Sequence, residues 1–237
     1  MWNTFAQTVN DTLGTAMPSL SQPSAQAVTN DLTLWDLALK GGWIMVVLLI
    51  LSLLACYIFV ERLLLIKKSA KSDPTYLSRI RDYIHEGKIS SAINLSETQQ
   101  TPGGRMVLKG LQRLGRPVQD IATAIENVGN IEVAKLERHM PLLATIAAGA
   151  PMIGFLGTVT GMIRAFYDMA NAGSNVDVTL LSSGIYEALV TTVGGLIVGI
   201  ITLFAYNYLV SLIDHVVTKS EAQALEFMDM LNEPAKR

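Results

Sequence analysis

The chain has 237 residues, of which 50% are hydrophobic and only 16% charged, and its formal net charge is −2. A composition this apolar lies outside the range of ordinary soluble domains. The near-neutral charge, without a basic patch interleaved with aromatic residues, argues against a nucleic-acid partner. The single cysteine, Cys56, leaves no intramolecular disulfide to order the fold.

The apolar residues gather in three runs, and none of these runs contains Asp, Glu, Lys, Arg or His. At about 1.5 Å of rise per residue, a helix of each run can cross a hydrocarbon layer of roughly 30 Å. The sequence therefore predicts an all-α integral membrane protein with transmembrane helices at 42–60, 141–163 and 188–213.

Residues 1–41 precede the first span. The first thirty are rich in Ser, Thr, Asn and Gln and have little periodicity, which predicts an external tail. Trp35 and Trp43 lie just before and at the start of the apolar run, where amphipathic rings favour the headgroup level, so an interfacial helix is expected there. A cleaved signal peptide is disfavoured, because the run starts after about forty residues and ends in Glu61-Arg62.

Basic residues near the ends of the spans set the expected orientation. They follow the first span and precede the second, which places 61–140 and 214–237 in the cytoplasm, and the amino terminus and the 164–187 loop outside it. The residues concerned are Arg62, Lys67, Lys68, Lys71, Lys135 and Arg138.

The region 61–140 is predicted to be helical, with breaks at Gly87, at 102–104 and at 115–117. From Val118 the apolar residues recur at helical spacing up to the second span, and the third span continues past its apolar run to Met230. The second and third membrane helices are therefore expected to extend into the cytoplasm.

No catalytic constellation is visible. His85, His139 and His215 are scattered without metal-ligand partners at short spacing, and the sequence has no glycine-rich phosphate loop or strand-turn-nucleophile motif. We therefore expect no enzyme activity, no metal site and no cofactor.

Small residues mark the second and third spans. They let membrane helices approach closely, which indicates helix packing within the chain or between copies of it. A proline within or before a membrane helix removes one backbone hydrogen bond and is expected to kink it. The packing residues are Gly154, Gly157, Gly161, Gly195 and Gly199, and the kinks are expected at Pro141 and Pro151.

Threonines give each of these spans a polar face. Thr145 shares one with Gly149, Met152 and Thr160 on the second span, and Thr192 shares one with Gly199, Tyr206 and Asn207 on the third. A threonine in a membrane helix most often donates to its own backbone, so periodicity alone leaves a pore-lining role as the second interpretation.

Glu187 stands at the outer mouth of the third span, where a carboxylate is costly unless it is paired or hydrated. It is a candidate functional residue, and the alternative is an interfacial carboxylate that pairs with Arg164. No acidic residue lies deeper in any span. A proton path through this chain would therefore need a carboxylate from another chain.

Two motifs carry a resemblance to a known family. They are LATIAAGAPMIGFLGTVTGM at 143–162 and GIYEALVTTVGGL at 184–196. They resemble the signature spans of the ExbB/TolQ/MotA superfamily of bacterial inner-membrane proton channels. The single span before the large loop favours the ExbB and TolQ branch. Ser183 in place of the usual proline, the order of Phe155 and Leu156, and the charge of Arg164 depart from the pattern.

The resemblance implies a ring of five subunits in the bacterial inner membrane, with the second and third spans around a central pore. That pore would hold helices of an ExbD- or TolR-like single-span partner, whose aspartate would face Thr145 and Thr192, while Glu187 would shape the periplasmic end. Proton-motive force would drive motion that acts on a TonB- or TolA-like protein. The alternatives are a MotA-like flagellar stator, a secondary transporter and a non-conducting scaffold; TonB-type and Tol-type outputs, and proton and sodium, are not distinguished.

Overall fold

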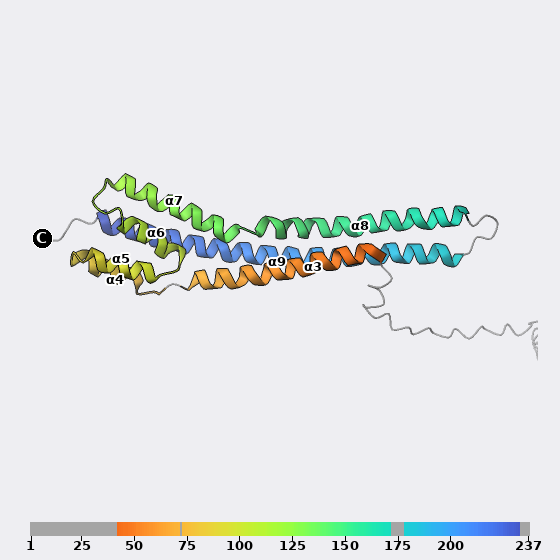
Figure 1. The fold of residues 1–237 in the computed structure, drawn as a ribbon, viewed down its shortest axis with the longest axis horizontal. Helices are drawn as coiled ribbons and strands as arrows, with labels where there is room; N and C mark the ends of the chain where they lie inside the picture. Colours follow the sequence, from red (N-terminus) through yellow and green to blue (C-terminus); the bar gives the residue numbers. More distant parts are fainter. Residues whose placement is uncertain (1–41, 72, 172–177, 233–237) are drawn as a thin grey trace, which may run out of the picture. The chain divides into compact units, whose positions relative to one another are not determined.

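The computed structural model describes residues 42–71, 73–171 and 178–232, so the tail and interfacial helix predicted for 1–41 lie outside the described residues. Within these ranges the structure contains helices and no strand (Figure 1). Three helical stretches are long and apolar enough to cross a membrane, which confirms the predicted fold class. The helices are α3 (Gly42–Ala70), α4 (Tyr76–His85), α5 (Ile89–Thr98), α6 (Pro102–Leu111), α7 (Val118–Glu137), α8 (Met140–Asn171) and α9 (Val178–Asn232).

The long helices exceed the spans predicted from hydropathy. α8 has 32 residues and α9 has 55. α8 ends at Asn171 and α9 begins at Val178, so most of the predicted 164–187 loop is helical. α9 also continues to Asn232, well beyond the apolar run that ends at residue 213. The apolar run marks the part suited to lipid, while helical hydrogen bonding continues on either side of it.

A break separates α7 from α8. α7 ends at Glu137, with Arg138 as its carboxyl-terminal cap, and α8 begins at Met140. Pro141 therefore stands in the first turn of α8, where its missing N–H leaves no helical hydrogen bond unmade. The sequence pattern alone predicted a helix that runs on to Pro141, and the structure ends it at Glu137, four residues earlier.

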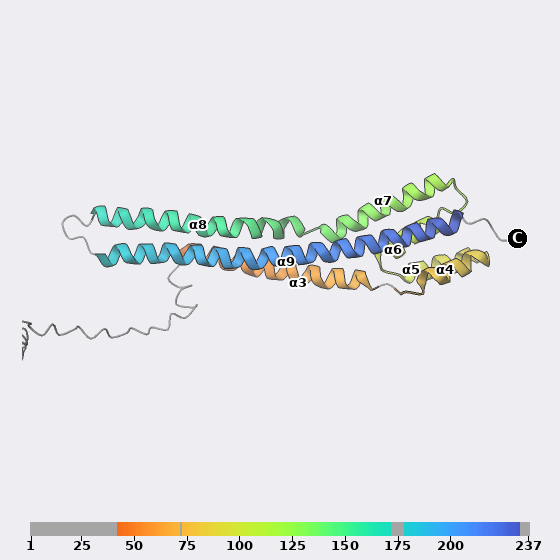
Figure 2. The same ribbon diagram turned by 180° about the vertical axis from the view of Figure 1, so that it is seen from behind.

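α8 and α9 pack along each other, and α3 packs against both (Figures 1 and 2). The buried apolar residues of this part form a larger cluster around Leu143, Leu209 and Ile66, and a smaller one of Ile44, Leu48 and Ala150. Large apolar side chains also cover the outer faces of the same helices, and Phe204 is 73% exposed. An apolar outer surface on long helices matches a lipid environment.

The remaining helices form what we name the short-helix bundle: α4–α7 together with residues 214–232 of α9. Its core is built around Phe227 of α9, which packs with residues of α4, α6 and α7. The amino end of α6 is capped by Thr101, whose hydroxyl oxygen accepts from the Gly104 amide. The bundle thus has a core separate from that of the membrane helices.

The buried phenol of Tyr76 gives the short-helix bundle a pH dependence. Burial raises the pKa of Tyr76, although its hydrogen bond to Ser96 Oγ, of 2.8 Å, acts in the opposite direction. A raised folded-state pKa means that stability is complete below the unfolded value of about 10 and is lost as the pH rises above it. We expect Tyr76→Phe to remove that part of the alkaline loss, as followed by thermal unfolding at rising pH. Tyr57→Phe, at an exposed site, is the control, and an unchanged alkaline loss in Tyr76→Phe would contradict the expectation.

Candidate functional site

The contact between α8 and α9 depends on glycines that face each other. A Cβ atom built on Gly195 would lie 2.6 Å from the Ala150 carbonyl oxygen and 2.8 Å from Gly154 Cα. A Cβ atom on Gly154 would lie 2.8 Å from the Thr191 carbonyl oxygen. The two backbones are therefore so close at this level that neither position has room for a side chain.

The other three predicted packing glycines lie at the same contact. A Cβ atom on Gly157 would meet the side chain of Thr191, and one on Gly161 would meet Ala188. A Cβ atom on Gly199 would lie 2.5 Å from Cγ of Pro151, so the proline ring fills the space over that glycine. At all five positions a side chain larger than hydrogen would collide with the facing helix.

Thr192 makes a polar contact between the two helices. Its hydroxyl donates to the Gly154 carbonyl at 3.1 Å and lies 3.1 Å from the Thr158 hydroxyl. Thr158 Oγ1 donates its one hydrogen to the Phe155 carbonyl at 2.6 Å. Thr158 therefore cannot donate a hydrogen bond to the Thr192 hydroxyl at the same time. The Thr192 oxygen therefore keeps free acceptor capacity on a half-buried side chain.

Thr145 lies apart from this pair. Its side chain is exposed, and its hydroxyl donates to the Pro141 carbonyl at 2.8 Å, one turn back along its own helix. Within one chain, the structure does not bring Thr145 and Thr192 together.

Two further threonines belong to this contact and were not singled out from the sequence. Thr158 pairs with Thr192, and Thr191 is buried where it fills the space beside Gly157. The Thr191 hydroxyl donates to the Ala188 carbonyl at 2.8 Å. Both lie inside the two motifs, but their pairing depends on which turn of α8 meets which turn of α9, and a sequence does not show that register.

Glu187 lies near the amino end of α3. A Cβ atom on Gly42 would be 2.3 Å from Glu187 Oε1, and Gly42 has a φ of 64°, so both space and backbone conformation favour glycine there. Glu187, Arg164 and Thr160 line a cavity of about 90 Å³ between the three long helices. Within the part of the chain that the structure describes, Glu187 and Arg164 form no ion pair with each other.

A second polar cluster, not predicted from the sequence, lies at the break between α7 and α8. The Arg62 side chain, on α3, donates to the Lys135 carbonyl at 3.1 Å and to Glu61 Oε1 at 3.0 Å, and lies 2.9 Å from His139 Nδ1. Glu61 Oε2 lies 3.2 Å from the same ring nitrogen. The His139 nitrogen therefore either accepts from Arg62 or donates to Glu61, and the cluster ties α3 to the end of α7.

Over residues 42–71, 73–171 and 178–232, no group of three or more His, Cys, Asp or Glu side chains lies close enough to hold a metal ion. At the α8–α9 contact beside Gly154, the polar groups that meet are hydroxyls and backbone carbonyls.

Comparison with known proteins adds to this geometry. Residues 98–222 match the model of the MotA/TolQ/ExbB proton channel family. The chain belongs to this family. It is 34% identical over 80% of its length to an ExbB-like biopolymer transport protein of Synechocystis sp., covering 76% of that protein. It is 27% identical over 77% of its length to the Tol-Pal system protein TolQ of Haemophilus influenzae, covering 86% of it.

A third relative, an ExbB homologue of Methanothermobacter thermautotrophicus, is 27% identical over 80% of the chain and is covered over 67% of its own length. Two of these relatives are named as ExbB-type biopolymer transport proteins, and the other is a Tol-Pal system protein. Together with the three apolar helices, they identify the chain as a multi-pass membrane protein with an ExbB/TolQ-type role.

Proposed function

We propose that this chain is the ring-forming subunit of a proton channel in the bacterial inner membrane, with its amino terminus in the periplasm. Copies of the chain, five by resemblance to the family, would surround the helices of an ExbD- or TolR-like partner. Proton flow would drive relative motion of ring and partner, and this motion would act on a TonB- or TolA-like protein. Family membership and the ExbB and TolQ relatives support this type of role.

The observation that carries the proposal is the Thr192 hydroxyl between α8 and α9. It stands at a level of the helices where glycines leave no room for side chains, and its oxygen can accept a further hydrogen bond. Such a group can accept a hydrogen bond from a neutral carboxylic acid. When that acid is ionised, Thr192 can turn its hydrogen from the Gly154 carbonyl to the carboxylate.

The acid itself must come from a partner. The apolar runs 141–163 of α8 and 188–213 of α9 contain no Asp, Glu, Lys, Arg or His. A carboxylate on a partner helix, placed opposite Thr192, would supply the missing titratable group. Glu187 would hold the periplasmic approach polar, beside the cavity it shares with Arg164 and Thr160. Thr145 would belong to the same pathway through a neighbouring copy.

The energy for motion would come from charge neutralisation. The electrical part of the proton-motive force supplies about 2.3 kcal/mol per charge per 100 mV. Protonation from the periplasm removes the cost of holding a charge among apolar helices, so the partner helix is free to move relative to the ring. Release of the proton to the cytoplasm restores the charge and completes the cycle.

The test is to remove the hydroxyl without changing the shape of the side chain. We expect Thr192→Val to lower activity that depends on proton-motive force about tenfold or more. Without the hydroxyl, the polar groups that it bonds are left without a partner in a site with little access to water. Growth or uptake is measured with membrane level and oligomer size in parallel. Thr145→Val and Glu187→Gln are measured in the same assay.

Thr202→Val is the matched control. Thr202 lies on α9 as well and is buried, at 4% exposure, but its hydroxyl donates only to the Val198 carbonyl of its own helix. Full activity in Thr192→Val would mean that the residue only packs helices and that the chain is a scaffold. Copurification with flagellar proteins instead of an ExbD- or TolR-like protein would indicate a MotA-like stator.

A further inference from the structure

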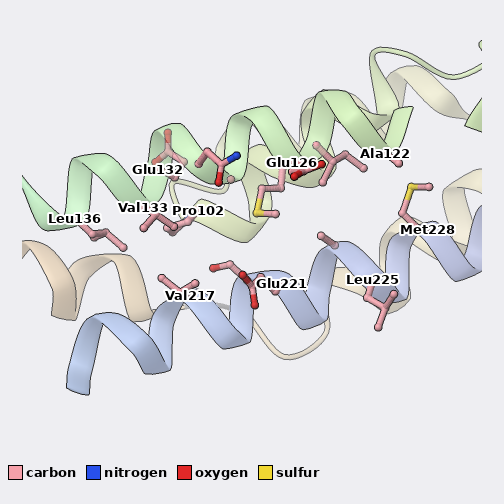
Figure 3. Close-up of a pocket in the computed structure, with 16 residues that line it drawn as sticks. Pro102, Ala122, Glu126, Glu132, Val133, Leu136, Val217, Glu221, Leu225 and Met228 are labelled. Carbon is pink, nitrogen blue, oxygen red and sulfur yellow. The ribbon is translucent and has the colours of Figure 1, made fainter. Parts of the chain in front are cut away.

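An apolar groove of about 310 Å³ separates α7 from α9 in the short-helix bundle (Figure 3). Ala122, Glu126 and Val133 lie on its α7 side, and Glu221 and Leu225 lie on the facing side of α9. Met106 of α6 contributes to its lining from between the two helices. We name this the α7–α9 groove. Leu225 is 65% exposed, which is unusual for a large apolar residue outside the part of α9 that is suited to lipid.

A second cavity, of about 360 Å³, continues the groove toward the α7–α8 break. Leu136 and Val217 line the groove. Glu137, next to Leu136, and Asp214, about one turn before Val217, line the second cavity together with Tyr206. The two spaces therefore follow one another along the same side of α7 and α9. Together the two spaces extend from Ala122 to Glu137, which are fifteen residues apart, or about 22 Å along a helix.

The rim of these two spaces is negatively charged. Glu126 and Glu221 stand over the groove, and Glu137 and Asp214 stand over the second cavity; all four are exposed. Among the described residues none of the four forms an ion pair. Glu132, which also lines the groove, is already paired with Arg105 and Lys135. The rim thus has four uncompensated carboxylates and no free cation among its lining residues.

This rim lies on the same face of α9 as Thr192. At about 100° per residue, Asp214 is only about 40° around the helix from Thr192, and Glu221 is about 20° from Asp214. Leu209, which belongs to the buried cluster shared with α3, is about 140° away from Asp214. A helix that passes Thr192 would therefore run onto the acidic rim, on the side of α9 turned away from α3.

We propose that the α7–α9 groove and the second cavity bind the cytoplasmic segment of the single-span partner, a basic stretch with apolar residues at helical spacing. The proposal rests on the function proposed above, which supplies the partner and the orientation. Lys and Arg gather on the cytoplasmic flank of a transmembrane helix. Such a flank would enter at Glu137 and Asp214, and its apolar residues would cover Leu225 as a helix in a groove.

The charge on the rim distinguishes this occupant from lipid. An acyl chain would match the apolar floor, but the cytoplasmic leaflet has an anionic surface, and four carboxylates repel anionic headgroups. A basic peptide gains from the same four charges and from the apolar floor. The groove is therefore suited to a segment that is both basic and apolar.

Photo-crosslinking in native membranes identifies the occupant directly. The full chain is made with a benzophenone amino acid in place of Leu225, and in a control in place of Ile131, which is 54% exposed but does not line the groove. We expect the Leu225 position to crosslink to the cytoplasmic flank of the span of a single-span protein. Crosslinks to a second copy of this chain, to lipid, or equally from both positions would overturn the proposal.

Charge neutralisation tests the acidic rim. The probe is a labelled 14-residue peptide of Leu and Lys, with Leu at helical spacing, added to the full chain in nanodiscs of neutral lipid. Two exposed ion pairs are expected to account for about fivefold in affinity, so Glu126→Gln with Glu221→Gln should weaken binding by that factor. The control is Glu97→Gln with Glu226→Gln, two exposed carboxylates that do not line the groove. Equal weakening in both double variants, or no binding at all, would overturn the proposal.

The two proposals fail in different ways. If a single-span protein copurifies and Thr192→Val abolishes activity, but the Leu225 position does not crosslink to that protein, only the groove assignment is wrong. If no single-span protein copurifies and Thr192→Val is fully active, the proposed function is wrong.

Discussion

Gly195→Ala is expected to destabilise the α8–α9 pair by about 3 kcal/mol, near the upper end for an added methyl group in a filled site. The new Cβ atom would lie 2.6 Å from the Ala150 carbonyl oxygen and 2.8 Å from Gly154 Cα. Both atoms belong to the backbone of α8, so no rotamer change relieves the overlap and the helices must separate. Separation also breaks the hydrogen bond from Thr192 to the Gly154 carbonyl. The measurement is unfolding of the purified protein by titration with sodium dodecyl sulfate.

The adjacent glycine provides the control. A Cβ atom on Gly194 would meet Met45 Sδ at 3.0 Å, and a flexible methionine side chain can move aside. A Cβ atom on Gly149 would have nothing within 4 Å. We expect Gly194→Ala and Gly149→Ala to stay close to the parent protein. If all three alanine variants unfold alike, the close backbone contact does not limit stability, and the packing role of Gly195 is wrong.

The membrane helices were predictable because the bilayer restricts what a sequence can do. Only helices satisfy every backbone group in lipid, so the charge-free runs at 42–60, 141–163 and 188–213 were sufficient to predict them. The sequence also indicated which glycines face another helix, because small residues at intervals of four mark one helix face. Hydropathy did not set the helix ends, since helical hydrogen bonding continues past the apolar run at both ends of α9.

Contacts between distant segments could not be predicted. Arg62 donates to a carbonyl 73 residues away, and Thr192 donates to the Gly154 carbonyl and lies beside the Thr158 hydroxyl across the hairpin. Each pairing depends on the axial register of two helices, and periodicity fixes only the face of each helix separately. The α7–α9 groove was missed for the same reason, because it exists only where two helices diverge around α6.

α9 makes two different contacts along its length. Beside Gly154 and Gly195, the backbone of α9 lies directly against that of α8. Toward the break, the larger side chains of Tyr206 and Val210 stand on α9 and line the second cavity. α9 thus shares a tight membrane contact with α8 and, beyond the break, borders the acidic groove together with α7.

Arg62→Ala is expected to lower stability by about 3 kcal/mol, because removing a buried cation leaves a cavity and leaves its part-buried partners without compensation. Arg62 is only 2% exposed. Its guanidinium donates to the Lys135 carbonyl and to Glu61, and it also contacts the His139 ring nitrogen. The Lys135 carbonyl belongs to the last turn of α7, where helical partners are lacking. Loss of the hydrogen bond from Arg62 to this carbonyl should loosen the contact of α3 with the α7–α8 break. Unfolding by sodium dodecyl sulfate, together with amide hydrogen exchange at the carboxyl end of α7, measures both effects.

Arg62→Lys separates charge from geometry. A lysine keeps the positive charge but cannot reach three acceptors in the fixed geometry of a guanidinium, so we expect it to recover only part of the lost stability. Lys67→Ala, at an exposed site five residues further along α3, should change little. If Arg62→Ala matched Lys67→Ala in stability and left exchange at the end of α7 unchanged, the cluster would not hold α3 in place. In that event the break between α7 and α8 would have to be fixed by the apolar contacts of Ile66 and Leu136 alone.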